Sequence, residues 1–200
     1  MVFDYLLANW MEVLGFISGL LCVWLLIKEN IWTFPIGLLY ALITVVVVYN
    51  ERLFADVILN FYYVVMNAFG WYFWLFGGQG RRSQDALEVG VIPLKQIAWI
   101  VLIMASGTLL MGWGFSTYSN ADLAYADSFT TVASFIAMYL AAKKYLESWY
   151  LWFVVDVVQV ILYVVKGIEL YALLYLTYLG MAYWGWKSWK ASIRQVVIEP

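Results

Sequence analysis

Hydrophobic residues follow one another along most of this chain in long runs separated by short polar segments. Seven runs approach or reach the roughly 17–25 residues that a helix needs to cross about 30 Å of hydrocarbon. The fifth run is short, and we expect its helix to begin near Asp127 or to extend to Lys144. The predicted spans are residues 11–27, 31–49, 53–76, 96–115, 128–142, 149–165 and 170–189.

Backbone polar groups must be paired inside a lipid bilayer, so runs of this length are expected to be helices. The sequence therefore predicts an all-α polytopic membrane protein with seven transmembrane helices. Composition supports this, because 66% of the residues are hydrophobic and 12% are charged, whereas soluble domains are about half apolar and about one quarter charged. We expect no cleavable signal peptide, because the first residues include Asp4 and no small-residue cleavage site follows the first apolar run.

The sequence lacks residues that several kinds of chemistry require. It has no histidine, and Cys22 is its only cysteine, so a histidine-ligated metal, a histidine general base and an intramolecular disulfide are excluded. A retinal-binding protein would need a lysine in the middle of its last span, and there is none. We predict no enzyme activity, no metal, no cofactor and no nucleic-acid partner.

The basic residues are distributed unequally between the two ends of the predicted helices. Nine lie on one side of the membrane and two on the other, which places the C-terminus in the cytoplasm and the N-terminus in the periplasm of a bacterial inner membrane. The two on the outer side are Arg52 and Lys166, and the nine on the inner side are Lys28, Arg81, Arg82, Lys95, Lys143, Lys144, Lys187, Lys190 and Arg194.

A weak internal repeat relates the first three spans to the last three. The motif Gly-Trp-x-x-Trp ends the third span, from Gly70, and the seventh span, from Gly185. A glutamate stands in the short turn before the second helix of each triplet, as Glu29 and as Glu147. Three spans, one linking span and three further spans make a 3+1+3 arrangement.

The repeat predicts how the chain is divided. Residues 1–95 form the first three-helix repeat with a cytoplasmic loop, residues 96–126 the linking helix and outer loop, and residues 127–200 the second three-helix repeat with a cytoplasmic tail. One linking helix gives both triplets the same orientation, which makes the repeat parallel. Transporters built from repeats bind their substrate near the midplane between the halves, and Asp156 lies at that depth.

Asp156 is the most informative residue of the chain. A carboxylate in the middle of an apolar span costs about 2.5–3.5 kcal/mol on insertion scales, and such residues usually face a bundle interior and serve a function. Its helical face also carries Trp149, Trp152, Gln159 and Tyr163, at spacings of three and four residues. No lysine or arginine lies in the middle of a span to neutralise Asp156. We therefore interpret the cation that pairs with it as the substrate.

Other spans supply amides, hydroxyls and aromatic rings that suit a flat cationic ring. Aromatic faces attract a desolvated cation by about 2 kcal/mol or more. The predicted substrate-binding residues are Trp149, Trp152, Asp156, Gln159, Asn60, Tyr63, Asn67, Tyr40, Thr131 and Tyr175.

Several of these side chains have alternative structural roles. Asn60 and Asn67 can equally form hydrogen bonds between helices, and Asp156 can be a protonated packing residue. Four tryptophans at the cytoplasmic ends of spans are expected to anchor the protein in the membrane interface rather than bind a ligand, namely Trp71, Trp74, Trp186 and Trp189.

The sequence resembles the PnuC family of vitamin transporters over nearly its whole length. The resemblance is carried by Asp127-Ser128, Lys144-Tyr145-Leu-Glu147, Trp149-x-x-Trp152 and Asn67-x-x-Gly70-Trp71-Tyr72-x-Trp74. It implies a seven-helix fold similar to full-length SWEET sugar transporters, and a homotrimer in the bacterial inner membrane. It also implies facilitated diffusion of nicotinamide riboside, thiamine or riboflavin, with trapping of the vitamin by a cytoplasmic vitamin kinase.

Two positions depart from the pattern of the nicotinamide riboside transporters. Asp156 stands where those proteins typically have asparagine, and Asn60 stands where a glutamine is frequent. Thiamine and nicotinamide riboside both carry a fixed ring charge that suits a carboxylate, whereas riboflavin is neutral. We therefore expect a thiamine transporter, with nicotinamide riboside uptake or a proton-coupled carrier using Asp156 as the alternatives.

Overall fold

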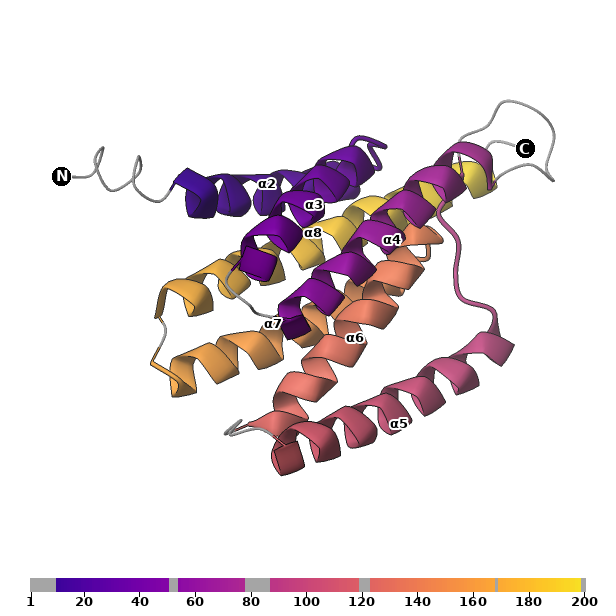
Figure 1. The fold of residues 1–200 in the computed structure, drawn as a ribbon. Coiled ribbons are helices and arrows are strands. Elements are labelled where there is room, and N and C mark those ends of the chain that lie inside the picture. Colours follow the sequence, from indigo (N-terminus) through magenta and orange to yellow (C-terminus); the bar gives the residue numbers. More distant parts are fainter. Residues whose placement is uncertain (1–9, 51–53, 78–86, 119–122, 168, 199–200) are drawn as a thin grey trace. The chain divides into compact units, whose positions relative to one another are not determined.

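The computed structural model describes residues 10–50, 54–77, 87–118, 123–167 and 169–198 of this chain. These residues form seven α-helices and no strand, which confirms the all-α prediction (Figure 1). The helices are α2 (Trp10–Ile27), α3 (Thr33–Asn50), α4 (Phe54–Phe76), α5 (Leu94–Tyr118), α6 (Ala124–Ala142), α7 (Ser148–Val165) and α8 (Glu169–Ile198).

The helices lie where the hydrophobic runs predict them, with some differences at their ends. Helix α6 begins at Ala124, before the expected start, and α8 continues beyond the predicted span to Ile198. Among the described residues, α5 and α7 are long and apolar enough to cross a membrane by length and composition, and Phe16–Ile27 and Thr33–Val46 are shorter apolar stretches.

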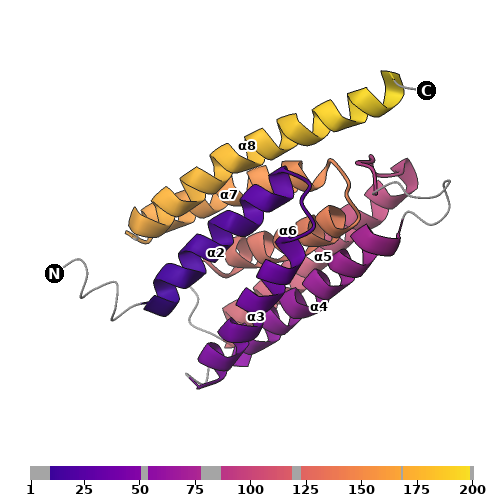
Figure 2. The ribbon, with the colours of Figure 1, turned by 90° about the horizontal axis from the view of Figure 1, so that it is seen from above.

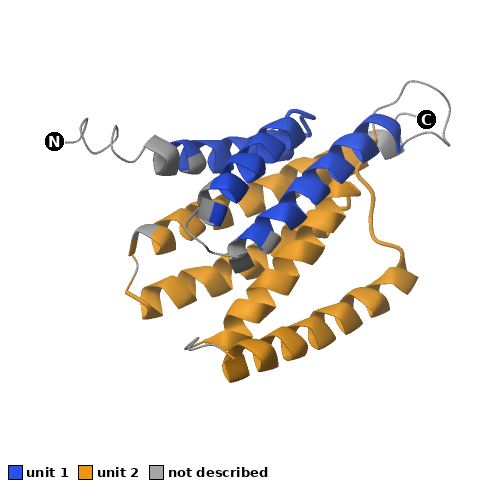
Figure 3. Ribbon diagram, viewed as in Figure 1, with its two compact units in different colours: residues 1–86 blue, residues 87–200 orange. Residues whose placement is uncertain are grey.

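The chain divides into two compact units, residues 1–86 and residues 87–200 (Figure 3). In the first unit, α2 packs against α3 and α3 against α4. In the second unit, α5 packs against α6, α6 against α7, and α7 against α8, so each helix contacts its neighbour in sequence. Helices α7 and α8 run side by side in both ribbon views (Figures 1 and 2), and Gly167 (φ 70°) supplies the left-handed residue of the short turn between them.

Two short turns, before α3 and before α7, have the same backbone geometry. Glu29 (φ 53°) in the first and Lys144 (φ 59°) in the second are the positive-φ non-glycine residues of the described chain. The next N–H group in each turn donates to the carbonyl five residues back, at 2.8 Å in the first turn and 2.9 Å in the second, as in a Schellman motif. Glu29 therefore corresponds to Lys144, 115 positions later, and not to Glu147 as the sequence pattern suggests.

The Gly-Trp-x-x-Trp motif of α4 holds an aromatic ring from the start of α3. Gly70 lies so close to the ring of Phe34 that a Cβ atom at position 70 would overlap it. Trp74 packs edge-on against the same ring, with 4.9 Å between centroids. Trp74 is 7% exposed, so its predicted role as an interface anchor is wrong.

The same motif in α8 holds Trp149 from the start of α7. A Cβ atom at Gly185 would overlap the indole of Trp149, and Trp189 meets that indole edge-on with 5.4 Å between centroids. Trp189 is completely buried, because it fills the seam between the two helices. The prediction that it anchors the protein at the membrane interface is therefore also wrong.

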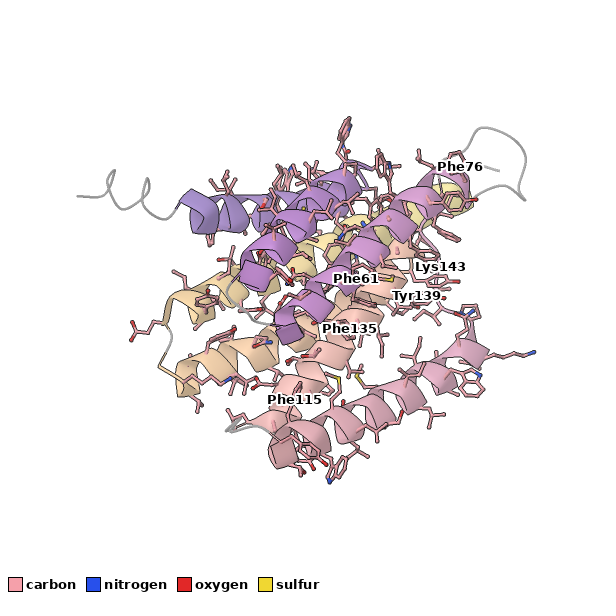
Figure 4. The ribbon with its side chains drawn as sticks, viewed as in Figure 1. Phe61, Phe76, Phe115, Phe135, Tyr139 and Lys143 are labelled. Carbon is pink, nitrogen blue, oxygen red and sulfur yellow. The ribbon has the colours of Figure 1, made fainter. Side chains whose placement is uncertain are left out.

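Two rows of side chains follow α6 on different sides. Val132, Ile136 and Leu140 form the buried core that α5 and the preceding segment cover. Phe135, Tyr139 and Lys143 follow one another at four-residue intervals along another side of α6 (Figure 4). The four-residue spacing of both rows is that of a single helix face.

Residues 87–92 are attached to the turn between α6 and α7. Gly90 exchanges two backbone hydrogen bonds with this turn, at 3.0 Å to the carbonyl of Lys144 and at 2.9 Å from the N–H of Leu146. The Lys144 ammonium donates to the carbonyl of Leu87, and the Ile92 N–H donates to the Glu147 carboxylate at 3.1 Å. The Lys144-to-Glu147 motif thus connects the start of α5 to the start of α7.

We predict that Gly185→Ala lowers the stability of the protein, because the new methyl group must displace a buried indole. Overpacking of this kind costs about 1–3 kcal/mol, which corresponds to a fall of several degrees in melting temperature. Melting is measured on purified protein in detergent by tryptophan fluorescence.

Gly180→Ala in the same helix is the matched control, because no atom lies within 4 Å of the added Cβ. We expect its melting temperature to equal or slightly exceed that of the wild type, since alanine favours helix formation more than glycine does. Equal melting temperatures for the two variants would show that Trp149 moves aside freely.

Candidate functional site

Asp156 lies at the centre of α7 and is 4% exposed. Its neighbour Val155 is also buried. Within the described residues, no hydrogen bond or ion pair reaches the carboxylate of Asp156. A buried ionised carboxylate needs a counter-charge or several donors, so Asp156 is either protonated or paired with a cation from outside the described residues.

Side chains on the predicted face of α7 contact two different helices, α8 and α6. Trp149 packs into the α7–α8 seam described above and is 2% exposed. Gln159 points towards α6, where its side-chain amide donates to the hydroxyl of Thr130 at 3.2 Å. Trp152 is half-buried between these two positions along the helix. Trp149 therefore has a packing role, while Gln159 has a polar partner in α6.

Thr130 is a site residue that the sequence did not single out. It is 1% exposed and accepts the Gln159 hydrogen bond while donating to the carbonyl of Asp127 at 3.0 Å. The predicted residue, Thr131, donates to the same carbonyl at 2.8 Å and is half-buried. Two adjacent threonines give no sequence signal that distinguishes which hydroxyl faces α7.

Tyr175 lies in a row of tyrosines at the α7–α8 seam. Tyr163 stacks with Tyr171 and with Tyr175, at centroid distances of 5.2 Å and 5.4 Å. Tyr178 meets Tyr175 edge-on at 5.9 Å. The structure thus brings Tyr175 to the same face of α7 that carries Asp156 and Gln159, one turn or more away along the helix.

In the first unit, Asn60, Tyr63 and Asn67 follow one another along α4. Asn60 and Asn67 are each 8% exposed. The Asn67 side-chain amide donates to the carbonyl of Tyr63 at 2.8 Å, and its oxygen lies against Gly37 of α3, where a Cβ atom would overlap it. This geometry favours the alternative in which Asn67 packs α3 against α4.

Tyr40 lies on α3 with 39% of its surface exposed. Its backbone carbonyl accepts a hydrogen bond from the Thr44 hydroxyl at 2.9 Å. Within the described residues, no three cysteine, aspartate or glutamate side chains gather where they could hold a metal ion.

Comparison with known proteins connects this arrangement to one family. A family model described as nicotinamide mononucleotide transporter matches residues 9–191. The nicotinamide riboside transporter PnuC of Escherichia coli is 26% identical over 94% of this chain and 87% of its own length. The riboflavin/roseoflavin transporter RibM of Streptomyces davaonensis is 25% identical over 90% of this chain and 84% of its own.

A solved structure has the same fold. The crystal structure of the vitamin B3 transporter PnuC matches 97% of this chain and 86% of its own length, with a TM-score of 0.73 and 23% sequence identity. The family match extends from the start of α2 into α8 and so includes every helix of both units. This chain therefore belongs to the nicotinamide mononucleotide transporter family, which is the PnuC family.

Proposed function

We propose that the protein is a membrane transporter for uptake of a cationic, water-soluble vitamin. The observation that carries this proposal is the buried carboxylate of Asp156, which has no partner among the described residues. Half-buried Trp152 and the tyrosines around Tyr163 add aromatic faces on the same side of α7. Together these groups suit a flat ring with a fixed positive charge.

Thiamine is the first substrate to test. Its thiazolium ring supplies the positive charge, and its aminopyrimidine can donate hydrogen bonds to a carboxylate or an amide. Asp156 in place of the usual asparagine supports this choice, because a carboxylate stabilises a cation more strongly than an amide does.

Nicotinamide riboside is the second candidate and carries an equivalent ring charge. Relatives from several bacteria are named as nicotinamide riboside transporters, which supports this candidate at least as well as Asp156 supports thiamine. RibM shows that relatives within this range of similarity transport different molecules. Riboflavin is neutral and would leave Asp156 without a partner, so we place it last.

We propose facilitated diffusion through a 3+1+3 arrangement of helices similar to that of full-length SWEET transporters. The matching turns at Glu29 and Lys144 and the matching Gly-Trp-x-x-Trp contacts support the internal repeat. The family resemblance supports a homotrimer in the bacterial inner membrane and trapping by a cytoplasmic vitamin kinase. The unequal distribution of lysine and arginine supports a periplasmic N-terminus and a cytoplasmic C-terminus.

We predict that a reporter fused after Pro200 is active in the cytoplasm, because nine of the eleven basic residues fall on the side of the C-terminus. Alkaline phosphatase and green fluorescent protein fusions measure this, since the first is active in the periplasm and the second fluoresces in the cytoplasm. A periplasmic C-terminus would contradict the proposed orientation.

We predict that transport is not driven by an ion gradient. In proteoliposomes containing the purified protein, labelled thiamine or nicotinamide riboside should equilibrate across the membrane without accumulating. Accumulation driven by an imposed pH or sodium gradient would instead favour the proton-coupled carrier, with Asp156 as the relay.

We predict that Asp156→Asn weakens binding of the transported cationic vitamin about tenfold to hundredfold, because a charge-assisted contact is worth about 1.5–3 kcal/mol. Thiamine and nicotinamide riboside are titrated side by side against purified protein, with intrinsic tryptophan fluorescence as the signal. The variant restores the asparagine of the nicotinamide riboside transporters, so the preference should shift towards that vitamin.

Glu88→Gln is the matched control, because it removes the same charge from an exposed side chain. We expect its affinity for both vitamins to equal that of the wild type. Unchanged affinity of Asp156→Asn for every cationic vitamin would identify Asp156 as a packing residue. Trp152→Ala then tests the aromatic contribution separately, because loss of stacking should weaken binding even if the carboxylate does not take part.

A further inference from the structure

A second carboxylate, Asp127 of α6, lies beside the end of the α7 face that carries Asp156. Asp127 is in the first turn of α6, and the ammonium of Lys166, which caps α7, lies 3.3 Å from both of its carboxylate oxygens. The two side chains are 37% and 34% exposed. Ion pairs this accessible to solvent contribute little to stability, so the ammonium can leave the carboxylate readily.

The polar face of α7 continues from Asp156 to this ion pair. Gln159, Tyr163 and Lys166 follow Asp156 at spacings of three, four and three residues, which keeps all four on one side of the helix. The rise of an α-helix places Lys166 about 15 Å along the axis from Asp156. Through its pairing with Lys166, Asp127 of α6 therefore lies beside this face of α7, at a different depth from Asp156.

Between Asp156 and Lys166, the same side of α7 carries groups that suit an aromatic cation. Tyr163 stacks with Tyr171 and Tyr175, and Tyr171 is 53% exposed. Lys166, which pairs with Asp127, follows Tyr163 by three residues on the same side of α7. Further along, the amide of Gln159 is bonded to Thr130, whose own hydroxyl donates to the carbonyl of Asp127.

We propose that Asp127 and the tyrosine stack of Tyr163, Tyr171 and Tyr175 form a second binding site, in which the cationic ring of the substrate displaces the Lys166 ammonium before it reaches Asp156. Without substrate, the Lys166 ammonium then occupies the place beside Asp127 that the positive charge of the substrate would take. An ammonium and a ring cation compete for the same carboxylate, but only the ring can also stack on tyrosine. This inference rests on the proposed uptake of a cationic vitamin.

The test is the rate at which purified full-length protein binds thiamine and nicotinamide riboside in stopped-flow tryptophan fluorescence at low salt. Asp127→Asn should lower the association rate constant about threefold to tenfold, because an attracting charge at the entrance is lost. The dissociation rate constant should stay within about twofold of wild type, because Asp156 still holds the bound ligand.

Lys166→Met should have the opposite effect, because the carboxylate loses its competing cation. Its association rate constant should rise above that of the wild type, and added sodium chloride should reduce the difference by screening both charges. Lys95→Met is the matched control: it removes the same charge from an exposed lysine in the first turn of α5 and should leave the rate unchanged.

Tyr171→Leu provides a test that does not alter charge. Loss of one stacking ring should slow association of both vitamins, and because Tyr171 is exposed the variant should fold as the wild type does. Melting temperatures are measured for each variant, so that a rate change in a destabilised protein is not mistaken for loss of the site.

Wild-type association rates for Asp127→Asn, Lys166→Met and Tyr171→Leu would overturn the second site. If Asp156→Asn still lost affinity in the same preparations, the proposed function would stand without it. Failure of the wild-type protein to bind either vitamin would overturn the proposed function, and this inference with it.

Discussion

Close contact between a glycine and an aromatic ring sets how α4 packs on α3 and how α8 packs on α7. In a membrane, helices gain little by burying apolar surface against each other, so their association depends on tight packing and interhelical polar contacts. Gly185 of α8 accepts the indole of Trp149 from α7, and Trp189 closes over the same indole. In α3 and α4, Phe34, Gly70 and Trp74 make the equivalent contact. Each contact sets the position of one helix along the other.

The placement of α7 has a direct consequence for the proposed site. With Trp149 held at the start of the helix, Tyr163 reaches Tyr171 and Tyr175 of α8 near its other end. On the other side, α6 presents Thr130 to Gln159. Asp156 lies between these two sets of contacts and is buried without a partner among the described residues. The neighbouring polar groups are therefore satisfied by each other and do not neutralise the carboxylate.

The motif from Lys144 to Glu147 has a structural role that its charges alone do not indicate. Lys144 is 5% exposed, although the sequence predicts it among the basic residues that face the cytoplasm. Its ammonium and the Glu147 carboxylate bind backbone groups of residues 87–92. The turn before α3 has the same backbone geometry, with Glu29 at the position that corresponds to Lys144. The shared turn geometry therefore does not depend on the attachment of residues 87–92, which belongs to the second unit.

The sequence by itself determined the seven helices, the family and the burial of Asp156, because hydrophobic runs and helical periodicity are properties of the chain alone. Tertiary structure decided which neighbour each face meets, and periodicity carries no information about that. It assigned Trp74 and Trp189 to the helix seams rather than to the membrane interface, and it selected Thr130 over Thr131 as the partner of Gln159. It also placed the oxygen of Asn67 against Gly37. A helical face can be read from spacing, but whether it packs, binds or meets lipid depends on the helix opposite.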